Sequence, residues 1–125
     1  MDNYDTITTV TYFKSTDNGP GRLLMDNDDL GGNNEGFFLS LDGSEDSQTG
    51  KRKPRFLIDG GGRNNVAAAN SQSDGNWHQL AGTYDGSTLS IFVDGGLSNS
   101  KSVSFDPTAE NPNVNFAYDA DGITY

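Results

Sequence analysis

Residues 74–95 read DGNWHQLAGTYDGSTLSIFVDG, two alternating apolar runs joined by one Asp-Gly pair and bracketed by two more. Glycine accepts the positive φ of a tight turn, and aspartate tolerates it through local side-chain hydrogen bonds. An Asp-Gly pair between two alternating runs is a strong hairpin signal. The stretch therefore predicts a turn at Asp85-Gly86 that joins strands near 77–84 and 87–94.

The alternation also predicts which face of this hairpin is buried. A one-residue slip would mix apolar with polar side chains on each face, so the pattern itself selects the pairing. The expected inward set is Leu80, Leu89, Ile91 and Val93, and the expected outward set is Gln79, Ala81, Thr83, Thr88 and Ser90. With a two-residue turn, the expected partners are Leu80 with Ile91, Gly82 with Leu89, and His78 with Val93.

Other segments rich in β-branched and aromatic residues also have strand character, and no segment of useful length has helical periodicity. The expected strands are Thr6–Phe13, Leu23–Met25, Glu35–Asp42, Arg55–Asp59, Val66–Asn70, Val103–Phe105 and Val114–Tyr118, with turns at 17–21 and 59–65. Together with the hairpin these make roughly eight short strands, which favours an all-β protein. We expect residues 1–125 to form a single antiparallel β-sandwich or jelly-roll domain.

Composition excludes several classes of function. The net charge of −10 argues against nucleic-acid binding, because basic surface supplies affinity for a phosphate backbone. The chain has no cysteine, hence no disulfide and no thiolate metal site. No apolar stretch is long enough to insert into a membrane. The opening residues MDNYD do not form a signal peptide, so we expect a mature or excised piece if the parent protein is secreted.

The motif G-x-W-H-x-x-A-x-T-Y-D-G-x-x-x-x-x-x-V-D-G, from Gly75 to Gly95, resembles the laminin G-like domains of the concanavalin A-like jelly-roll fold. The segments TITTVTYFK, GFFLSLDG and RFLIDGG are similar to earlier strands of that family. The resemblance implies a β-sandwich that acts in recognition. It also implies one more strand at each end than this sequence offers, so we expect exposed edges that invite self-association.

Two aromatic residues, Trp77 and Phe92, fall on the polar side of the predicted hairpin, together with Gln79. A flat apolar ring suits the apolar face of a sugar, while amide and hydroxyl groups nearby suit its hydroxyls. These three residues are therefore candidate glycan ligands. In the alternative interpretation, loops or terminal strands cover both rings and their role is packing.

A basic segment, KRKPR, interrupts the otherwise acidic chain. Its cations could contact sulfated or carboxylated glycans, as laminin G domains often do. The alternative is a solvated hairpin loop balanced by Glu45 and Asp46. The candidate residues are Lys51, Arg52, Lys53 and Arg55.

Clusters of carboxylates suggest a calcium site, because calcium prefers six to eight oxygen ligands. Some laminin G-like domains bind calcium at the loop rim, and the resemblance places Glu35 near one such ligand position. The alternative is solvated acidic loops. The candidate ligands are Asp26, Asp28, Asp29, Glu35, Asp119 and Asp121.

Catalysis has little support in the sequence. His78 is the only histidine, and on the apolar face we expect it to lie at the core edge with a backbone hydrogen bond. A Ser-His-Asp site would depend on this one residue. The carboxylate pattern E-x-D-x-x-E of glucanases with this fold has no match. The protein is therefore expected not to be an enzyme.

The leading hypothesis is a non-catalytic module that binds carbohydrate in a secreted or cell-surface protein. The alternative is a structural or adhesive module, binding protein or acting as a spacer, in a larger extracellular or virion protein. The resemblance contributes much of this functional inference.

Overall fold

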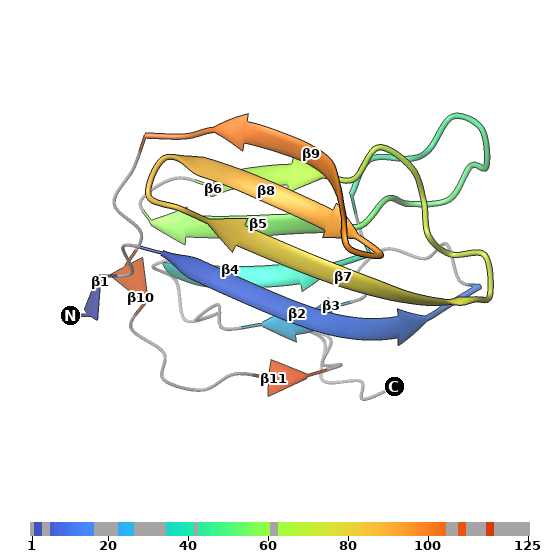
Figure 1. Ribbon diagram of the computed structural model, residues 1–125, viewed down its shortest axis with the longest axis horizontal. Helices are drawn as coiled ribbons and strands as arrows, with labels where there is room; N and C mark the ends of the chain where they lie inside the picture. The colour runs from blue at the N-terminus through green and yellow to red at the C-terminus, as the bar shows by residue number, and fades with distance from the viewer. Residues whose placement is uncertain are drawn as a thin grey trace.

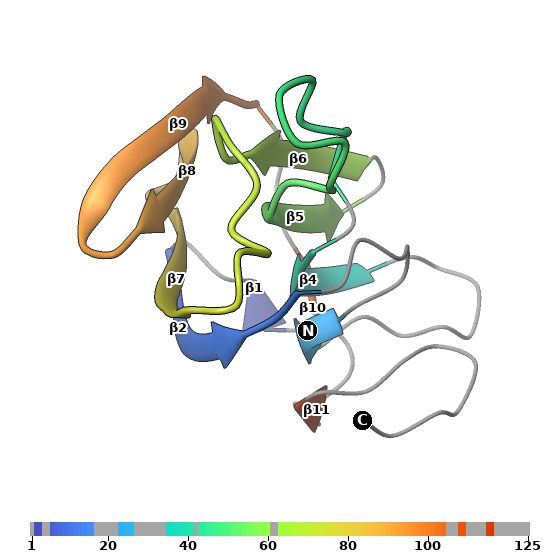
Figure 2. The same ribbon diagram turned by 90° about the vertical axis from the view of Figure 1, so that its right-hand side faces the viewer.

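The structure, a computed structural model, describes residues 2–3, 6–16, 23–26, 35–41, 43–60, 63–104, 108–109 and 115–116. These residues form strands, turns and loops arranged as two antiparallel sheets that face each other (Figures 1 and 2). The predicted all-β antiparallel sandwich is confirmed. The described segments contain no helix of the length and apolarity that crossing a membrane needs.

The larger layer is a five-stranded sheet with the order β11-β3-β4-β5-β6. All its neighbouring strands are antiparallel, and β3 pairs with β4 through a register irregularity between Leu23 and Met25. Its strands are β3 (Leu23–Asp26), β4 (Glu35–Ser40), β5 (Arg55–Gly60), β6 (Arg63–Ala67) and β11 (Asn115–Phe116).

The smaller layer is a four-stranded sheet with the order β2-β7-β8-β9, and it faces the viewer in Figure 1. Strands β7 to β9 are consecutive, whereas β2 joins them from the start of the chain. Its strands are β2 (Ile7–Lys14), β7 (Trp77–Tyr84), β8 (Thr88–Val93) and β9 (Gly96–Ser102). A separate short pair joins β1 (Asp2–Asn3) to β10 (Thr108–Ala109).

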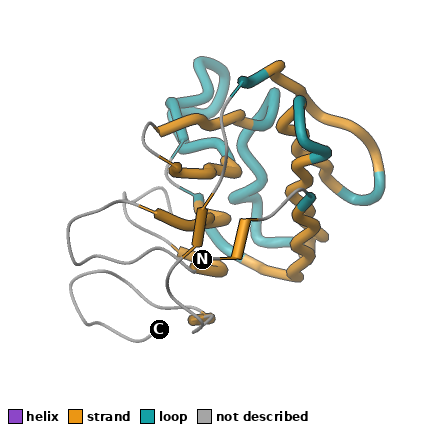
Figure 3. The backbone as a smooth tube through the Cα atoms, turned by 90° about the vertical axis from the view of Figure 1, so that its left-hand side faces the viewer, coloured by secondary structure: helices purple, strands orange, loops and turns teal. Residues whose placement is uncertain are grey.

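The core lies between the two sheets, where the alternating apolar side chains of both layers meet (Figure 3 shows the layers from the other end). Leu80, Leu89 and Ile91 are fully buried, and Val93 packs against the same cluster. The inward face predicted for the hairpin is therefore confirmed. Across the core, the Phe56 ring lies so close to Gly82 that an added Cβ would be 2.4 Å from it.

The predicted pairing within the hairpin is wrong by two residues. Leu80 pairs with Val93, Gly82 with Ile91 and Tyr84 with Leu89, instead of the expected partners. The cause is the turn, whose central residues are Gly86 and Ser87, because Asp85 and Thr88 close it through a backbone hydrogen bond of 3.3 Å. Gly86 has a φ of 97°, and a positive φ at the first central position suits a type II′ turn.

The Asp85 side chain explains why the turn starts one residue later than expected. Its Oδ1 accepts hydrogen bonds from the backbone N–H groups of Ser87 at 2.9 Å and Thr88 at 2.8 Å. These bonds keep Asp85 outside the turn as its capping residue. A shift of two residues leaves each side chain on its predicted face, so the burial pattern survives the wrong pairing.

Other expectations also differ from the structure. Asn64 and Asn65 belong to β6 and not to a turn, because they pair with Ile58 and Leu57. Strand β9 lacks the apolar alternation that marks a strand and was not predicted. The strand expected at Val103–Phe105 is wrong for Val103 and Ser104, which follow the end of β9, and Phe105 lies outside the described residues. The segment 35–42 was expected to be buried on one side, yet Phe37 and Phe38 are both buried.

Candidate functional site

Trp77 begins β7 and is 69% exposed. The strand alternates, so Trp77 points away from the core on the side opposite His78 and Leu80. Within the part of the chain that the structure describes, most of this ring is therefore uncovered. Its register partner on the neighbouring strand is Lys14, the last residue of β2.

A second exposed ring, Tyr12, lies beside Trp77 and was missed from the sequence. Tyr12 is 66% exposed and pairs with Gln79, which puts it diagonally across from Trp77. Diagonal neighbours in an antiparallel pair are about 7–8 Å apart, which two aromatic side chains can bridge. Gln79 Nε2 donates a hydrogen bond of 2.8 Å to the Tyr12 hydroxyl and so restrains both side chains.

Phe92 also points to the outer face, yet it is not next to Trp77. It pairs with Ala81 on one side and Leu97 on the other, and it is only partly exposed. Ala81 follows Trp77 by four residues, about 14 Å along the strand. The two-residue shift of the hairpin separates these rings, so Tyr12 and not Phe92 completes the pair with Trp77.

The surroundings of the two rings are polar but carry few charges. The four strands β2, β7, β8 and β9 contain no Asp or Glu, although the chain has 18 of them. Partly exposed hydroxyl and amide groups share the face between Trp77 and Leu97 with Ala81 and Phe92. The outward residues are Thr8, Val10, Tyr12, Lys14, Trp77, Gln79, Ala81, Thr83, Thr88, Ser90, Phe92, Leu97, Ser100 and Ser102.

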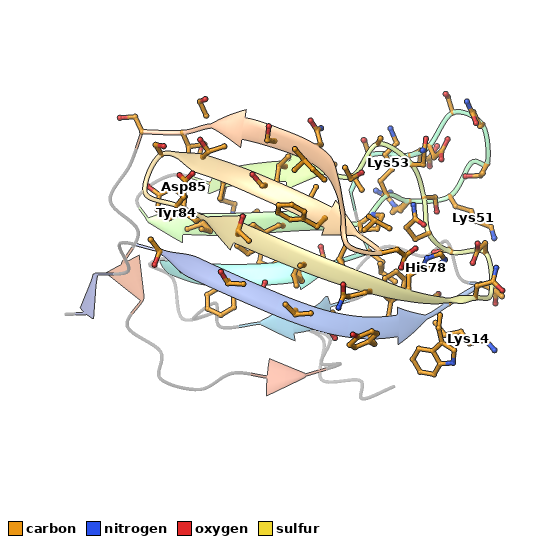
Figure 4. The ribbon with its side chains drawn as sticks, viewed as in Figure 1. Lys14, Lys51, Lys53, His78, Tyr84 and Asp85 are labelled. Atoms are coloured by element: carbon orange, nitrogen blue, oxygen red, sulfur yellow. The ribbon has the colours of Figure 1, made fainter. Side chains whose placement is uncertain are left out.

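His78 lies behind Trp77 on the inward side of β7, against the Phe13 ring, with its centroid 5.9 Å away. The predicted position at the core edge is confirmed, but the predicted backbone partner is wrong. The partners are carboxylates: Nδ1 lies 2.8 Å from Asp94 Oδ2, and Nε2 lies 3.0 Å from Asp74 Oδ1. Figure 4 shows His78 at this end of the sheet.

The charge of this cluster follows from its contacts. Burial by itself lowers the pKa of His78, but its hydrogen bonds and ion pairs with Asp94 and Asp74 outweigh burial and raise the pKa above 6.5. The backbone N–H of Asn76 and the His78 ring lower the pKa of Asp74 to about 2. The hydrogen bonds from His78 and the Gln79 backbone lower the pKa of Asp94 as well. Both ring nitrogens are occupied, so His78 fixes the loop before β7 and the β8–β9 turn to the strand.

The basic segment mostly contacts the protein's own groups. Lys51 Nζ donates to the Ser73 carbonyl, and Arg52 donates to the Gly43 carbonyl at 3.3 Å. The Arg55 guanidinium lies 5.0 Å from the Phe38 ring centre. Lys53 lies close enough to Asp46 to contribute to its lowered pKa, after the backbone N–H groups of Ser71 and Gln48. Glycan binding by the basic segment stays a prediction.

The acidic candidates are only partly described. Asp26 ends β3 and Glu35 begins β4, and the structure describes their backbones alone. Asp28, Asp29, Asp119 and Asp121 lie outside the described residues. Within the described segments, no three His, Asp or Glu side chains have a geometry that could hold a metal ion. Calcium binding therefore stays a prediction.

Comparison with known proteins places this geometry in a family. A laminin G family model, described as the concanavalin A-like lectin/glucanases superfamily, matches residues 2–125. The chain belongs to this superfamily. A comparison with curated proteins found no match. The superfamily contains both lectins and glucanases, so membership is compatible with binding a carbohydrate or a protein and does not by itself decide against catalysis.

Proposed function

We propose that the protein is a non-catalytic module that binds a glycan on the outer face of the four-stranded sheet, in a secreted or cell-surface protein. The observation that carries this proposal is the pair of exposed rings, Trp77 and Tyr12, on neighbouring strands. Exposed apolar side chains that lie side by side often mark a surface that binds a ligand.

The chemistry between the rings and the rest of the face favours a sugar. Gln79 holds the Tyr12 hydroxyl at 2.8 Å, so the ring edges are already polar and oriented. Threonine and serine hydroxyls continue the face towards β9. A sugar offers an apolar ring face for stacking and hydroxyls around its edge, and this surface offers the matching groups. Preorganised side chains lose less entropy on binding.

We also propose that this face binds its sugar without cleaving it. A glycosidase needs two carboxyl groups on either side of the scissile bond. Strands β2, β7, β8 and β9 contribute none to the face that carries the rings. A sugar stacked on Trp77 would therefore be bound there without being cleaved.

The test is a titration of ring variants against an oligosaccharide selected on a glycan array, run with and without calcium. Trp77→Ala and Tyr12→Ala should each weaken binding at least tenfold, because stacking and exclusion of water are lost. Both variants should keep their β-sheet circular dichroism and melt within a few degrees of the wild type. Tyr12→Phe should lose less affinity, because only the hydroxyl held by Gln79 is removed.

The matched control is Leu97→Ala, which removes a side chain that is 60% exposed at the far edge of the same face. It should leave affinity within about twofold, since surface substitutions away from a site have small effects. Equal losses for Trp77→Ala and Leu97→Ala would contradict the proposal. Failure to bind any sugar would favour the second candidate.

The second candidate is an adhesive module that pairs through an edge strand. Strand β2 lies at the edge of its sheet and is rich in threonine, valine and aromatic residues. Its outer backbone edge is a template for another chain. Concentration-dependent dimers, combined with no sugar binding, would support this candidate.

A further inference from the structure

The first three residues of β7 extend beyond the end of the neighbouring strand β8. The pairing of β7 with β8 begins at Leu80, so Trp77 and Gln79 lie outside that ladder. The β8–β9 turn continues it instead: the Asp94 N–H donates to the Gln79 carbonyl at 2.9 Å, and Asp94 Oδ1 accepts from the Gln79 N–H at 2.9 Å. Asp94 therefore anchors the end of β7, next to the exposed Trp77.

His78 holds this anchor in place and adds a second one. Its side chain is 11% exposed and lies between two carboxylates, with Nδ1 2.8 Å from Asp94 Oδ2 and Nε2 3.0 Å from Asp74 Oδ1. Asp74 belongs to the loop before β7, and its Oδ1 also accepts from the Asn76 N–H at 2.8 Å. Trp77 thus lies between two segments that His78 ties to the strand.

Both contacts of His78 need a protonated ring. A protonated imidazole has two N–H donors, one for each carboxylate, whereas a neutral imidazole has one donor and one lone pair. After loss of the proton, a nitrogen lone pair faces a carboxylate oxygen at 2.8 or 3.0 Å, and the two repel each other. Deprotonation therefore breaks one of the two contacts, whichever nitrogen keeps its proton.

The surroundings of the ring set the pH at which this happens. Within the described residues, the charged groups that contact the His78 ring are the two carboxylates. From β2 the ring faces Phe13, which has no charge, and the loop before β7 binds the Lys51 ammonium through the Ser73 carbonyl. Burial lowers the pKa of His78, but the contacts with the two carboxylates outweigh burial and raise it above 6.5. The proton is therefore present in mildly acid solution and is lost as the pH rises through the raised pKa.

We propose that His78 is a pH-sensitive clamp on the pair of exposed rings, so that the outer face binds its glycan more tightly in mildly acid than in alkaline solution. This inference rests on the proposed glycan-binding function and adds its regulation by pH. His78 is a positioning residue, because its ring lies on the inward side of β7, away from the ligand. Its effect reaches Trp77 through the chain on both sides, and Tyr12 through the hydrogen bond from the Gln79 side chain.

The first measurement follows the rings without any sugar. Trp77 is the only tryptophan, so its indole N–H gives a single signal in the ¹⁵N NMR spectrum. The heteronuclear NOE of this group and of the Gln79 side-chain amide reports fast local motion. Both values should fall between about pH 5.5 and about pH 8.5, where few groups other than the single histidine titrate. In His78→Gln both should be low and independent of pH.

The second measurement titrates a neutral oligosaccharide, selected on a glycan array, over the same pH range. Binding by the wild type should weaken about fivefold towards alkaline pH, at the low end of typical coupling between two sites. His78→Gln should bind with the same affinity at all pH values, close to that of the wild type at alkaline pH. A neutral sugar does not titrate, so a change in affinity comes from the protein.

Two aspartate variants separate the contact from net charge. Asp94→Asn should lower the midpoint of both profiles by about one pH unit, because it removes an opposite charge beside His78. Asparagine also accepts the φ of 50° at this position and can still bond to the Gln79 N–H. The matched control is Asp85→Asn, which removes the same charge from the turn at the other end of β7 and should leave the midpoint in place (Figure 4).

The outcomes distinguish the clamp from the proposed function. Equal shifts in the two aspartate variants would overturn the inference, because net charge alone would then explain the result. Sugar binding by the wild type that is independent of pH would overturn it while leaving glycan binding intact. NOE values that fall with pH, without sugar binding at any pH, would support the clamp on the rings and overturn the glycan-binding function.

Discussion

The outer faces of the two sheets differ, although both carry large apolar residues. On the five-stranded sheet, Phe38 and Leu57 are register partners and are only 6% and 1% exposed. The Arg55 guanidinium lies over Phe38, and strand β10 contacts β4 and β5. On the four-stranded sheet, Trp77 and Tyr12 are 69% and 66% exposed.

The difference shows that one outer face is part of the packed structure and the other is a surface. Burial of Phe38 and Leu57 contributes to stability in the same way as the central core. Trp77 and Tyr12 contribute little, because water reaches most of both rings. Apolar residues on the open face therefore add little to folding, and the proposed ligand would give them a role.

The largest expected effect on stability comes from replacing a leucine with alanine on each of the two outer faces. Leu57→Ala should lower the free energy of unfolding by about 2–5 kcal/mol, because it leaves a cavity around a fully buried side chain. Leu97→Ala, at a position that is 60% exposed, should lower it by at most about 0.5 kcal/mol. Urea denaturation of both variants measures the difference. Similar losses would mean that the outer face of the five-stranded sheet is open as well.

A smaller effect tests how closely the inward faces fit. Gly82→Ala should cost about 1–3 kcal/mol, because the new Cβ would lie 2.4 Å from the Phe56 ring and push the sheets apart. The control is Gly96→Ala on β9, where the new Cβ would meet its nearest neighbour, the Val93 carbonyl oxygen, at 3.6 Å. The melting temperature of Gly82→Ala should be well below that of Gly96→Ala. Equal melting temperatures of the two variants would show that the sheets adapt to the added methyl group.

The smallest effect concerns His78, at the end of the open face. Its pKa is raised in the folded protein, so its stabilising contribution is complete below pH 6.5 and is lost as the pH rises through the folded pKa. The pKa values of Asp74 and Asp94 are lowered, so their contributions are present above about pH 4 and are lost at lower pH. The melting temperature should therefore be highest between about pH 4 and pH 6.5.

The fall in melting temperature above pH 6.5 is the part of this profile that tests His78. His78 is the only histidine and the chain has no cysteine, so few other groups titrate between pH 6.5 and 9. The fall in melting temperature over that range should be absent in His78→Gln. An unchanged alkaline fall in the variant would assign it to another group.

The sequence predicted the faces of the hairpin but not its pairing, for one physical reason. Alternation has a period of two, so a shift of two residues changes every partner and no face. The shift arises from hydrogen bonds between the Asp85 side chain and the backbone of Ser87 and Thr88, which an Asp-Gly pair alone does not reveal. Burial of both Phe37 and Phe38 was missed, because the alternation of Phe37, Leu39 and Leu41 with polar residues indicates only one buried face.

The candidate site was predicted in part. Trp77 and Gln79 were named, because the hairpin places them outward on one local strand. Tyr12 was missed, although alternation in TITTVTYFK puts it on the same face as Val10. Its position beside Trp77 depends on β2 pairing with β7, and local sequence patterns carry no information about such distant partners.

The pairing of β2 with β7 also has a consequence for how the protein folds. Tyr12 and Gln79 are 67 positions apart in the chain, whereas β7, β8 and β9 follow one another through short turns. Closing so long a loop costs more conformational entropy than forming the local hairpins, so we expect it to be slower. During synthesis, the segment ITTVTYFK must remain unpaired until β7 has been made, and such exposed strands aggregate readily. We therefore expect the ring pair to be assembled in a late step of folding.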